Sequence, residues 1–300
     1  MNQPLVRLSQ KFKRGITLGR VNRALIRRFY WIVQRVAKQF RISVLFLDPV
    51  NLKHLSISRF TDTQEICELL RQLRPVVTQF PLIRLGNSRD GGYLVPEDFD
   101  NISSCFSAGC DLEWSFERDL WERYNIVSNL IDEESKKPLN LPSEFTYTSA
   151  FLGSQNVMGT MKFSDWVQVH NRDVNGDLIL QMDIEGFEWE SIFEIPESIL
   201  RNFSTLVIEF HGTENLLNAK LFKSVYRPAL DKIIRNFVAV HIHGNNCCGT
   251  VTFGNMEFPR IFEVTFLRRD RVVSSSGYSE LPNPLDSRNI PERDEIRFKW

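Results

Sequence analysis

Beyond residue 100 the chain alternates short apolar runs with longer stretches in which apolar residues recur at helical spacing. Such runs, bounded by polar or glycine-containing segments, are typical of buried strands, and the stretches between them are typical of amphipathic helices. The predicted strands span residues 104–108, 126–131, 145–150, 178–182, 205–210, 237–242 and 261–266. The predicted helices span residues 116–124, 164–169, 188–193 and 219–235. This alternation predicts an α/β fold with a mostly parallel central sheet of about seven strands and helices on both faces.

Two elements precede this alternation, and a polar tail follows it. Residues 61–73 predict a helix capped by Thr61 or Asp62. A polar turn between the strand-like runs 83–86 and 91–96 predicts a hairpin. The last segment is rich in Ser, Pro and charge, and we expect it to wrap the core or stay mobile. We expect four parts: a basic helical extension (1–58), a helix and hairpin (59–100), a core (101–270) and a tail (271–300).

The net charge of zero conceals an asymmetry, because residues 1–47 contain eleven Lys or Arg and no acid. The rest of the chain then carries 26 basic and 37 acidic residues, a balance of minus 11. Residues 20–40 have helical periodicity with cations among apolar residues, a pattern compatible with peripheral contact of residues 1–47 with an anionic membrane surface. The alternative is a helix that packs on the core or on a second subunit, with its cations in water.

Other global features exclude several classes of protein. The sequence has no uninterrupted apolar run of roughly 18 residues, and its amino terminus lacks a signal peptide's apolar stretch and cleavage site. The five cysteines show no paired zinc spacing, and their odd number disfavours a disulfide framework, so we expect a cytoplasmic protein. No nucleic-acid partner is expected, because the cations gather at the amino terminus and leave the core acidic.

A cluster of acids follows the predicted strand 178–182, a short apolar run that only Gln181 interrupts. Asp183, Glu185, Glu188 and Glu190 lie within eight residues, and Gly186 permits the tight turn that leads into the next helix. Because ligands of open α/β sheets bind beyond the carboxyl ends of strands, we expect chemistry here. For Glu188 and Glu190 the alternative is simple stabilisation of the first helical turn, where acids are favoured.

Two further strand ends carry imidazoles, at His211 and in the pair His241 and His243. A substrate hydroxyl becomes a nucleophile when a base or a cation lowers its affinity for its proton. One hypothesis is general-base catalysis by His211 or His243, oriented by Asp183 or Glu185. The other is a divalent metal ion, since mixed carboxylate and imidazole ligands suit several such ions. The candidate metal ligands are Asp183, Glu209, His211 and His243.

The opposite half of the predicted sheet has features of a nucleoside site. Gly109 follows the first core strand, where the backbone must pass close to a ligand and turn. Asp132 ends the second strand, about twenty residues later, where an acid can accept hydrogen bonds from both hydroxyls of a ribose; the alternative is an ordinary turn residue. A full dinucleotide fingerprint and a Walker-type Gly-Lys-Ser are both absent, so a nucleoside ligand is favoured over a dinucleotide.

Four elements occur in one order: Asp90-Gly-Gly-Tyr, then Ser107-Ala-Gly followed by Phe116-Glu, then Asp132, then Asp183-Ile-Glu-Gly-Phe-Glu-Trp-Glu. Together, over roughly residues 82–266, they resemble the FkbM-type methyltransferases, which use S-adenosylmethionine. The resemblance implies a Rossmann-like methyltransferase fold and O-methylation of a sugar or other hydroxyl-bearing substrate. It also implies that the methionine portion of the cofactor lies near Ser107, Gly109 and Glu117, and that Asp132 holds the ribose. Asp183 is counted among the cofactor contacts. The Ser-Ala-Gly-Cys turn departs from the glycine-rich form of the methyltransferase loop.

The leading expectation is therefore an S-adenosylmethionine-dependent O-methyltransferase acting on a sugar, glycan or glycolipid-like hydroxyl. The alternative is a non-catalytic module that binds a glycan or nucleoside on the same scaffold, because fold does not fix function. The presence of Asp183, Glu185 and His211 favours the enzyme, since a pure binder has no evident need for them. A nicotinamide dehydrogenase is disfavoured by the missing dinucleotide fingerprint.

Overall fold

The computed structural model describes residues 42–48, 53–171 and 176–298, and its chain divides into two compact units. The smaller unit contains the described residues up to Ile66 together with Asn215–Ser224. In it β1 (Ile42–Asp48) pairs antiparallel with β2 (Lys53–Arg59). The described part of the predicted 1–58 helical extension is therefore two strands, whereas the basic segment 20–40 lies outside the described residues.

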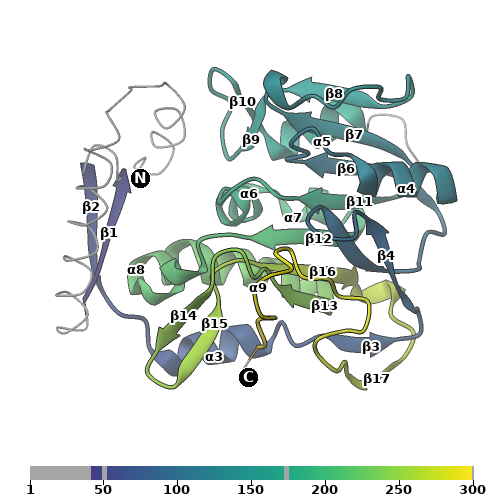
Figure 1. The fold of residues 1–300 in the computed structure, drawn as a ribbon. Coiled ribbons are helices and arrows are strands. Elements are labelled where there is room, and N and C mark those ends of the chain that lie inside the picture. The colour runs from purple at the N-terminus through teal and green to yellow at the C-terminus, as the bar shows by residue number, and fades with distance from the viewer. Residues whose placement is uncertain (1–41, 49–52, 172–175, 299–300) are drawn as a thin grey trace. The chain divides into compact units, whose positions relative to one another are not determined.

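The larger unit, Cys67–Glu214 with Val225–Trp300, is built on one seven-stranded sheet. Its order is β13-β16-β12-β11-β6-β7-β8, which Figure 1 shows from β13 at the bottom to β8 at the top. The strands are β6 (Ile102–Ala108), β7 (Val127–Asp132), β8 (Thr146–Ser149), β11 (Asp177–Met182), β12 (Phe203–Phe210), β13 (Phe237–Gly244) and β16 (Phe262–Arg268). All seven predicted strands are confirmed. The sheet is parallel except for β16, which pairs antiparallel with both β12 and β13.

The direction in which the sheet grows reverses between β6 and β11. From β6 the chain adds β7 and β8 on one side, and then returns to add β11 and β12 on the other side. The crossover connections on the two sides of such a point diverge, which leaves the carboxyl ends of β6 and β11 as the natural place for a ligand. This edge is the one at which the sequence places its acids.

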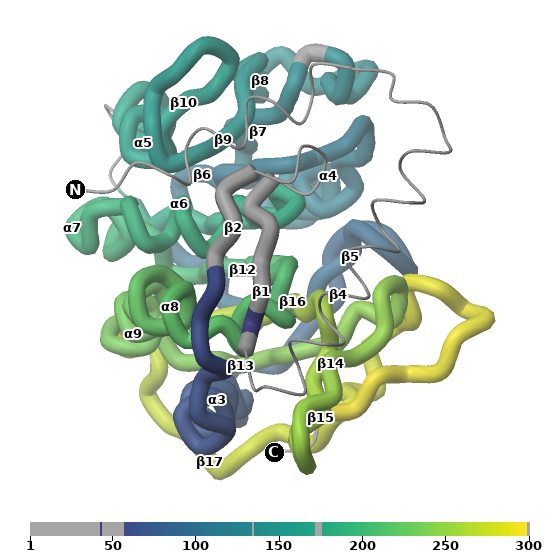
Figure 2. The backbone as a smooth tube through the Cα atoms, turned by 90° about the vertical axis from the view of Figure 1, so that its left-hand side faces the viewer, coloured from purple at the N-terminus to yellow at the C-terminus, as the bar shows by residue number. Residues whose placement is uncertain are grey.

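Both faces of the sheet are covered, as Figure 2 shows with the sheet turned by 90°. One face packs against α4 (Ser115–Tyr124) and against the predicted hairpin, formed by β4 (Leu82–Gly86) and β5 (Gly92–Pro96). The other face carries α5 (Phe163–His170), α6 (Glu188–Glu194) and α9 (Arg227–Asn236). The alternation of apolar side chains along the strands serves both layers: Cys105 faces α4 and the hairpin, and Phe106 packs on Trp166 of α5. The predicted mixed α/β architecture is thus confirmed.

Two helix predictions are refined by backbone chemistry. The predicted helix 61–73 is α3 (Thr63–Arg71), and the Asp62 carboxylate caps it by accepting from the Gln64 N–H at 2.7 Å. The predicted helix 219–235 is present as one continuous helical run, in which a π-helical stretch, η3 (Phe222–Tyr226), lies between α8 (Ala219–Leu221) and α9. Pro228 follows this stretch, and because it has no N–H to donate to the preceding turn, the α-helical ladder is interrupted there.

Short elements complete the described chain. They are β3 (Val76–Thr78), η1 (Glu134–Lys136), β9 (Phe151–Gly153), β10 (Thr160–Lys162), α7 (Glu197–Leu200), η2 (Thr213–Leu217), β14 (Thr250–Phe253), β15 (Met256–Pro259), η4 (Arg269–Arg271) and β17 (Ser275–Tyr278). Among the described residues no helix combines the length and apolar character needed to cross a membrane.

The tail is bound to the core and is irregular apart from β17, which pairs with β3. Asp286 lies 2.8 Å from His241 Nε2, and Glu295 lies 2.7 Å from His243 Nε2. Both histidines are buried and lie on β13. Of the two expected behaviours of residues 271–300, wrapping the core is therefore the one observed through residue 298.

One prediction concerns the end of α6, the helix that begins at the candidate site. Lys232 Nζ donates to the carbonyl oxygens of Ile192 (3.0 Å) and Ile195 (2.8 Å), and also to that of Phe193. We expect Lys232→Ala to lower the free energy of unfolding by about 1 to 3 kcal/mol, because a charged donor to otherwise unpaired helix-end carbonyls is lost. Lys223→Ala, which removes an exposed ion pair with Glu65 at 3.8 Å, is the control and should change it by less than about 1 kcal/mol. Urea unfolding measures the free energy of unfolding of both variants, and equal losses would contradict the stabilising role of Lys232.

Candidate functional site

The candidate site is formed where β11 leaves the sheet. The buried residues of β11 end at Met182, and the chain then turns sharply before α6 begins at Glu188. Glu185 (φ 56°) and Gly186 (φ 102°) both have left-handed backbone conformations in this turn. A non-glycine residue rarely adopts this conformation, so the turn stores strain that other contacts must offset.

Those contacts come from the Glu188 side chain, which is 0% exposed. Its Oε1 accepts the backbone N–H groups of Ile184 at 3.1 Å and of Gly186 at 3.0 Å. Its Oε2 accepts the backbone N–H of His211 at 3.4 Å. Glu188 therefore joins the loop after β11 to the end of β12, and it is not a solvated residue of a first helical turn.

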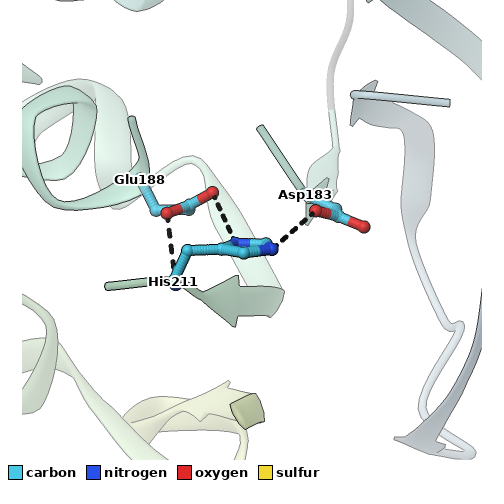
Figure 3. Close-up of side chains that lie close together, drawn as sticks. All are labelled: Asp183, Glu188 and His211. Carbon is cyan, nitrogen blue, oxygen red and sulfur yellow. Dashed lines mark hydrogen bonds and ion pairs between the residues drawn. The ribbon is translucent and has the colours of Figure 1, made fainter. Parts of the chain in front are cut away.

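The same carboxylate orients the imidazole of His211, the residue that follows β12 (Figure 3). Glu188 Oε1 lies 3.1 Å from His211 Nδ1. The other ring nitrogen, Nε2, faces Asp183 Oδ1 at 3.8 Å and Glu185 Oε2 at 3.8 Å. Trp189 of α6 donates from Nε1 to the His211 carbonyl at 2.9 Å and fixes the backbone. The ring is thus held on one side and presented to two carboxylates on the other.

This surrounding charge dominates the protonation of the site. Burial acts to lower the pKa of His211, but the hydrogen bond to Glu188 and the charges of Glu188, Asp183 and Glu209 outweigh it and raise this pKa to about 10. Burial, followed by the charge of Glu209, raises the pKa of Asp183 well above its ordinary value. Burial and then the charge of Glu263 raise the pKa of Glu209 to about 7. At neutral pH His211 is therefore an imidazolium.

The structure brings together only part of the predicted metal set. Asp183, Glu188 and His211 offer ligand atoms within 4.8 Å of one another. Glu209 instead accepts the side-chain amide of Asn245 at 2.8 Å. His243, predicted as a base or ligand, has Nδ1 at 3.4 Å from Glu263 and Nε2 at 2.7 Å from Glu295.

The prediction for His243 is therefore revised. Both of its ring nitrogens are occupied, because antiparallel pairing aligns it with Glu263 while the tail supplies Glu295. Glu188 takes the place that Asp183 or Glu185 was expected to have as the group that orients His211. In the sequence, the only sign that Glu188 orients His211 was its position after the Gly186 turn. An acid that stabilises the first turn of a helix would occupy the same position.

A divalent metal ion would find two suitable atoms here. Asp183 Oδ1 is buried and has no hydrogen-bond partner among the described residues, and His211 Nε2 faces it. Glu188 is less suitable, because its oxygens already accept backbone and imidazole N–H groups. A histidine whose second nitrogen is held by a carboxylate is a frequent arrangement in metal sites. The donor set therefore fits a metal held by Asp183 and His211, with Glu188 behind the histidine.

The nucleoside side of the edge lies at the ends of β6 and β7. Asp183 N–H donates to the Ala108 carbonyl at 2.9 Å, which joins the two loops at the switch point. Gly109 (φ 83°) is required there, because an added Cβ would lie 1.6 Å from the Asp183 carbonyl oxygen. Asp132 accepts backbone N–H groups of Asp111 at 3.2 Å and of Glu133 at 2.7 Å, and this fixes its carboxylate at the end of β7.

Ser107 and Glu117, the other expected cofactor neighbours, lie inside the core. Their exposed fractions are 0% and 3%, and the Ser107 hydroxyl contacts both Glu117 and, at 2.9 Å, Gln181. Burial raises the pKa of Glu117 to about 7 against the hydrogen bond from Ser107. A ligand at the edge would thus meet the backbone above these residues, whereas their side chains support β6 and β11 from below.

Comparison with known proteins assigns no family. No family model matches the chain, and no curated protein matches it.

The pKa of His211 provides a direct test of this geometry. We expect the His211 imidazole to stay protonated at pH 8 and to titrate near pH 10, whereas His170, whose pKa burial lowers, titrates below its ordinary 6.5. In Glu188→Gln the pKa of His211 should fall, because a negative charge and an acceptor are lost. Histidine NMR titration, with His211→Gln for assignment, measures this; a wild-type pKa near 6.5 would contradict the arrangement.

The same shift predicts a pH dependence of stability. Because the folded-state pKa of His211 lies above its unfolded value of about 6.5, its stabilising effect is fully present below pH 6.5 and is lost as the pH rises toward 10. The stability difference between wild type and His211→Gln should therefore shrink across this window in urea unfolding. A constant difference from pH 6.5 to 10 would show that the charge of His211 does not contribute.

Proposed function

We propose that the protein is an S-adenosylmethionine-dependent methyltransferase that methylates a hydroxyl of a neutral sugar, glycan or glycolipid-like molecule. One observation carries the proposal: the Glu188–His211 pair at the carboxyl end of β12 presents Nε2 beside Asp183, next to the switch point of the sheet. The Rossmann-like order of the parallel strands and the resemblance to FkbM-type methyltransferases in residues 82–266 support the same function.

In this proposal Asp132 accepts the hydroxyls of the cofactor ribose. Its carboxylate is already oriented by two backbone N–H groups, and each oxygen keeps a further lone pair. The backbone at Gly109 passes beside the methionine portion, and Asp183 stands between cofactor and acceptor. When bound, S-adenosylmethionine supplies an electrophilic methyl group at this edge. The chain's own contribution is to orient the acceptor and to receive its proton.

His211 is the proposed proton acceptor. Glu188 fixes the ring through Nδ1, so the free Nε2 is the atom that takes the hydroxyl proton. The raised pKa means that this base must first lose a proton, and a positive charge bound beside Asp183 lowers the pKa by repelling that proton. His211 is therefore deprotonated more readily when a cation occupies the edge, which links the base to the loaded site.

The charge of the edge limits the acceptor. Glu185 and Glu188 surround a single imidazole together with Asp183 and Glu209, whose pKa values are raised by burial, so the edge offers an acceptor bearing a phosphate or carboxylate one cation among four carboxyl groups. A neutral polyol meets no such cost, and carboxylates are good acceptors for its other hydroxyls. This observation favours sugars over phosphorylated metabolites as acceptors.

The metal version of the mechanism uses the same residues. Asp183 and His211 would hold the ion, and bound metal would lower the proton affinity of a hydroxyl. In that version Glu188 orients a ligand, whereas in the metal-free version it orients a base. Chelation separates the two versions, because turnover is lost on chelation only if the metal version is right.

The first test is titration calorimetry with S-adenosylmethionine and S-adenosylhomocysteine. We expect saturable binding that weakens at least tenfold in Asp132→Ala, because the hydrogen bonds to the ribose are lost. Glu122→Ala, an exposed position on α4, is the matched control and should bind like the wild type. A folded wild-type protein that binds neither ligand would overturn the proposal and favour the non-catalytic glycan or nucleoside module.

The second test is the pH profile of methyl transfer to a panel of neutral sugars, with and without EDTA. We expect kcat/KM to rise with pH toward 10 in the wild type, since the base works only when deprotonated. In Glu188→Gln, kcat/KM should reach its plateau at lower pH. The plateau value should be roughly 10²-fold below that of the wild type, because the imidazole ring is no longer oriented. His211→Gln should lose turnover but keep cofactor binding. An unchanged profile in Glu188→Gln would contradict its role.

A further inference from the structure

Two adjacent cysteines follow β13 and take no part in the proposed reaction. Cys247 is half-buried and Cys248 is exposed, and their sulfur atoms lie 2.7 Å apart. This separation is inside the contact distance of two sulfurs, so the side chains lie on the same side of the turn and face each other. Cysteines that merely share a loop have no need of this arrangement.

The turn that carries them is held at both ends and from within. Asn245 N–H donates to the Ile261 carbonyl, and Arg260 N–H donates to the Gly249 carbonyl, both at 3.0 Å. The Cys247 N–H donates to Asn245 Oδ1 at 2.9 Å. These hydrogen bonds fix the two ends of the turn and keep the thiols on the same side of it.

The peptide group between the two cysteines also holds the tail. Arg293 donates from Nη1 to the Cys247 carbonyl, and the adjacent Asn246 donates to the Ile290 carbonyl at 2.9 Å. In a disulfide between neighbouring residues this peptide group becomes part of an eight-membered ring. Closing the ring reorients its carbonyl, and the contact with Arg293 depends on that orientation.

We propose that Cys247 and Cys248 are a thiol-disulfide modification site, which small disulfides such as oxidised glutathione convert to a vicinal disulfide that loosens residues 289–296 of the tail. This inference goes beyond the proposed methyl transfer and does not rest on it.

The chemistry proceeds by two exchanges. The exposed Cys248, as thiolate, attacks the small disulfide, forms a mixed disulfide and expels one thiolate. The Cys247 thiolate then attacks Cys248 Sγ, forms the Cys247–Cys248 bond and expels the second thiolate. The two protein thiols lose two protons and two electrons, which the small disulfide takes up as two thiols. Burial, and then the hydrogen bond with Cys248, raise the pKa of Cys247 to about 12, so Cys248 is the first nucleophile.

The chain offers a direct readout. No Lys or Arg lies between Asn236 and Arg260, so one tryptic peptide carries both cysteines and none of the other three. After treatment with oxidised glutathione and alkylation, this peptide should lack two hydrogen atoms and both alkyl groups, and dithiothreitol should reverse the change. Cys247→Ser should trap one glutathione on Cys248. Cys67→Ser is the matched control and should form the vicinal disulfide like the wild type.

Hydrogen–deuterium exchange tests the coupling to the tail. The oxidised protein should exchange about tenfold faster in residues 289–296, the size expected for the loss of one hydrogen bond. Arg293→Ala should show this faster exchange already in the reduced form and should not respond to oxidation. Separate glutathione adducts on Cys247 and Cys248, or an unmodified peptide, would overturn the site. A vicinal disulfide with unchanged exchange in the tail would overturn the coupling.

Discussion

The candidate site depends on one buried carboxylate. A charge without water is costly unless hydrogen bonds replace hydration, and Glu188 obtains these from Ile184 N–H, Gly186 N–H and His211. Because these donors belong to the loop after β11 and to the end of β12, satisfying the charge fixes both. The strained turn, the orientation of the imidazole and the position of Asp183 follow from that single requirement.

Histidines at two strands of the sheet, β12 and β13, contact carboxylates in different ways. On β13, His241 and His243 contact the tail carboxylates of Asp286 and Glu295, so these buried contacts attach the last segment to the sheet. His211 meets a carboxylate of its own edge through Nδ1 and keeps Nε2 directed toward the site. Similar histidine–carboxylate contacts at β12 and β13, the two strands that flank β16, thus attach the tail in one place and present a reactive group in the other.

The local predictions succeeded where burial and periodicity agree. All seven core strands were predicted to within a few residues, because each is a short apolar run whose two faces pack on separate layers. The helix expected over 219–235 is present, and its α-helical ladder is interrupted only by a π-helical stretch before Pro228, which has no N–H to donate. The FkbM resemblance, the cofactor and the acceptor stay predictions, since the comparisons bear on none of them.

The sequence by itself determined the order of elements, the carboxyl edge as the place where acids gather, and Asp183 and His211 as members of one cluster. It did not determine partners. Glu188 replaced Glu209 and His243 in that cluster because a side chain's partner depends on which distant segments converge. Asn245 binds Glu209, and Glu295 reaches His243 from 52 residues away. Such pairings are set by the antiparallel insertion of β16 and by the path of the tail, and neither can be inferred from local periodicity.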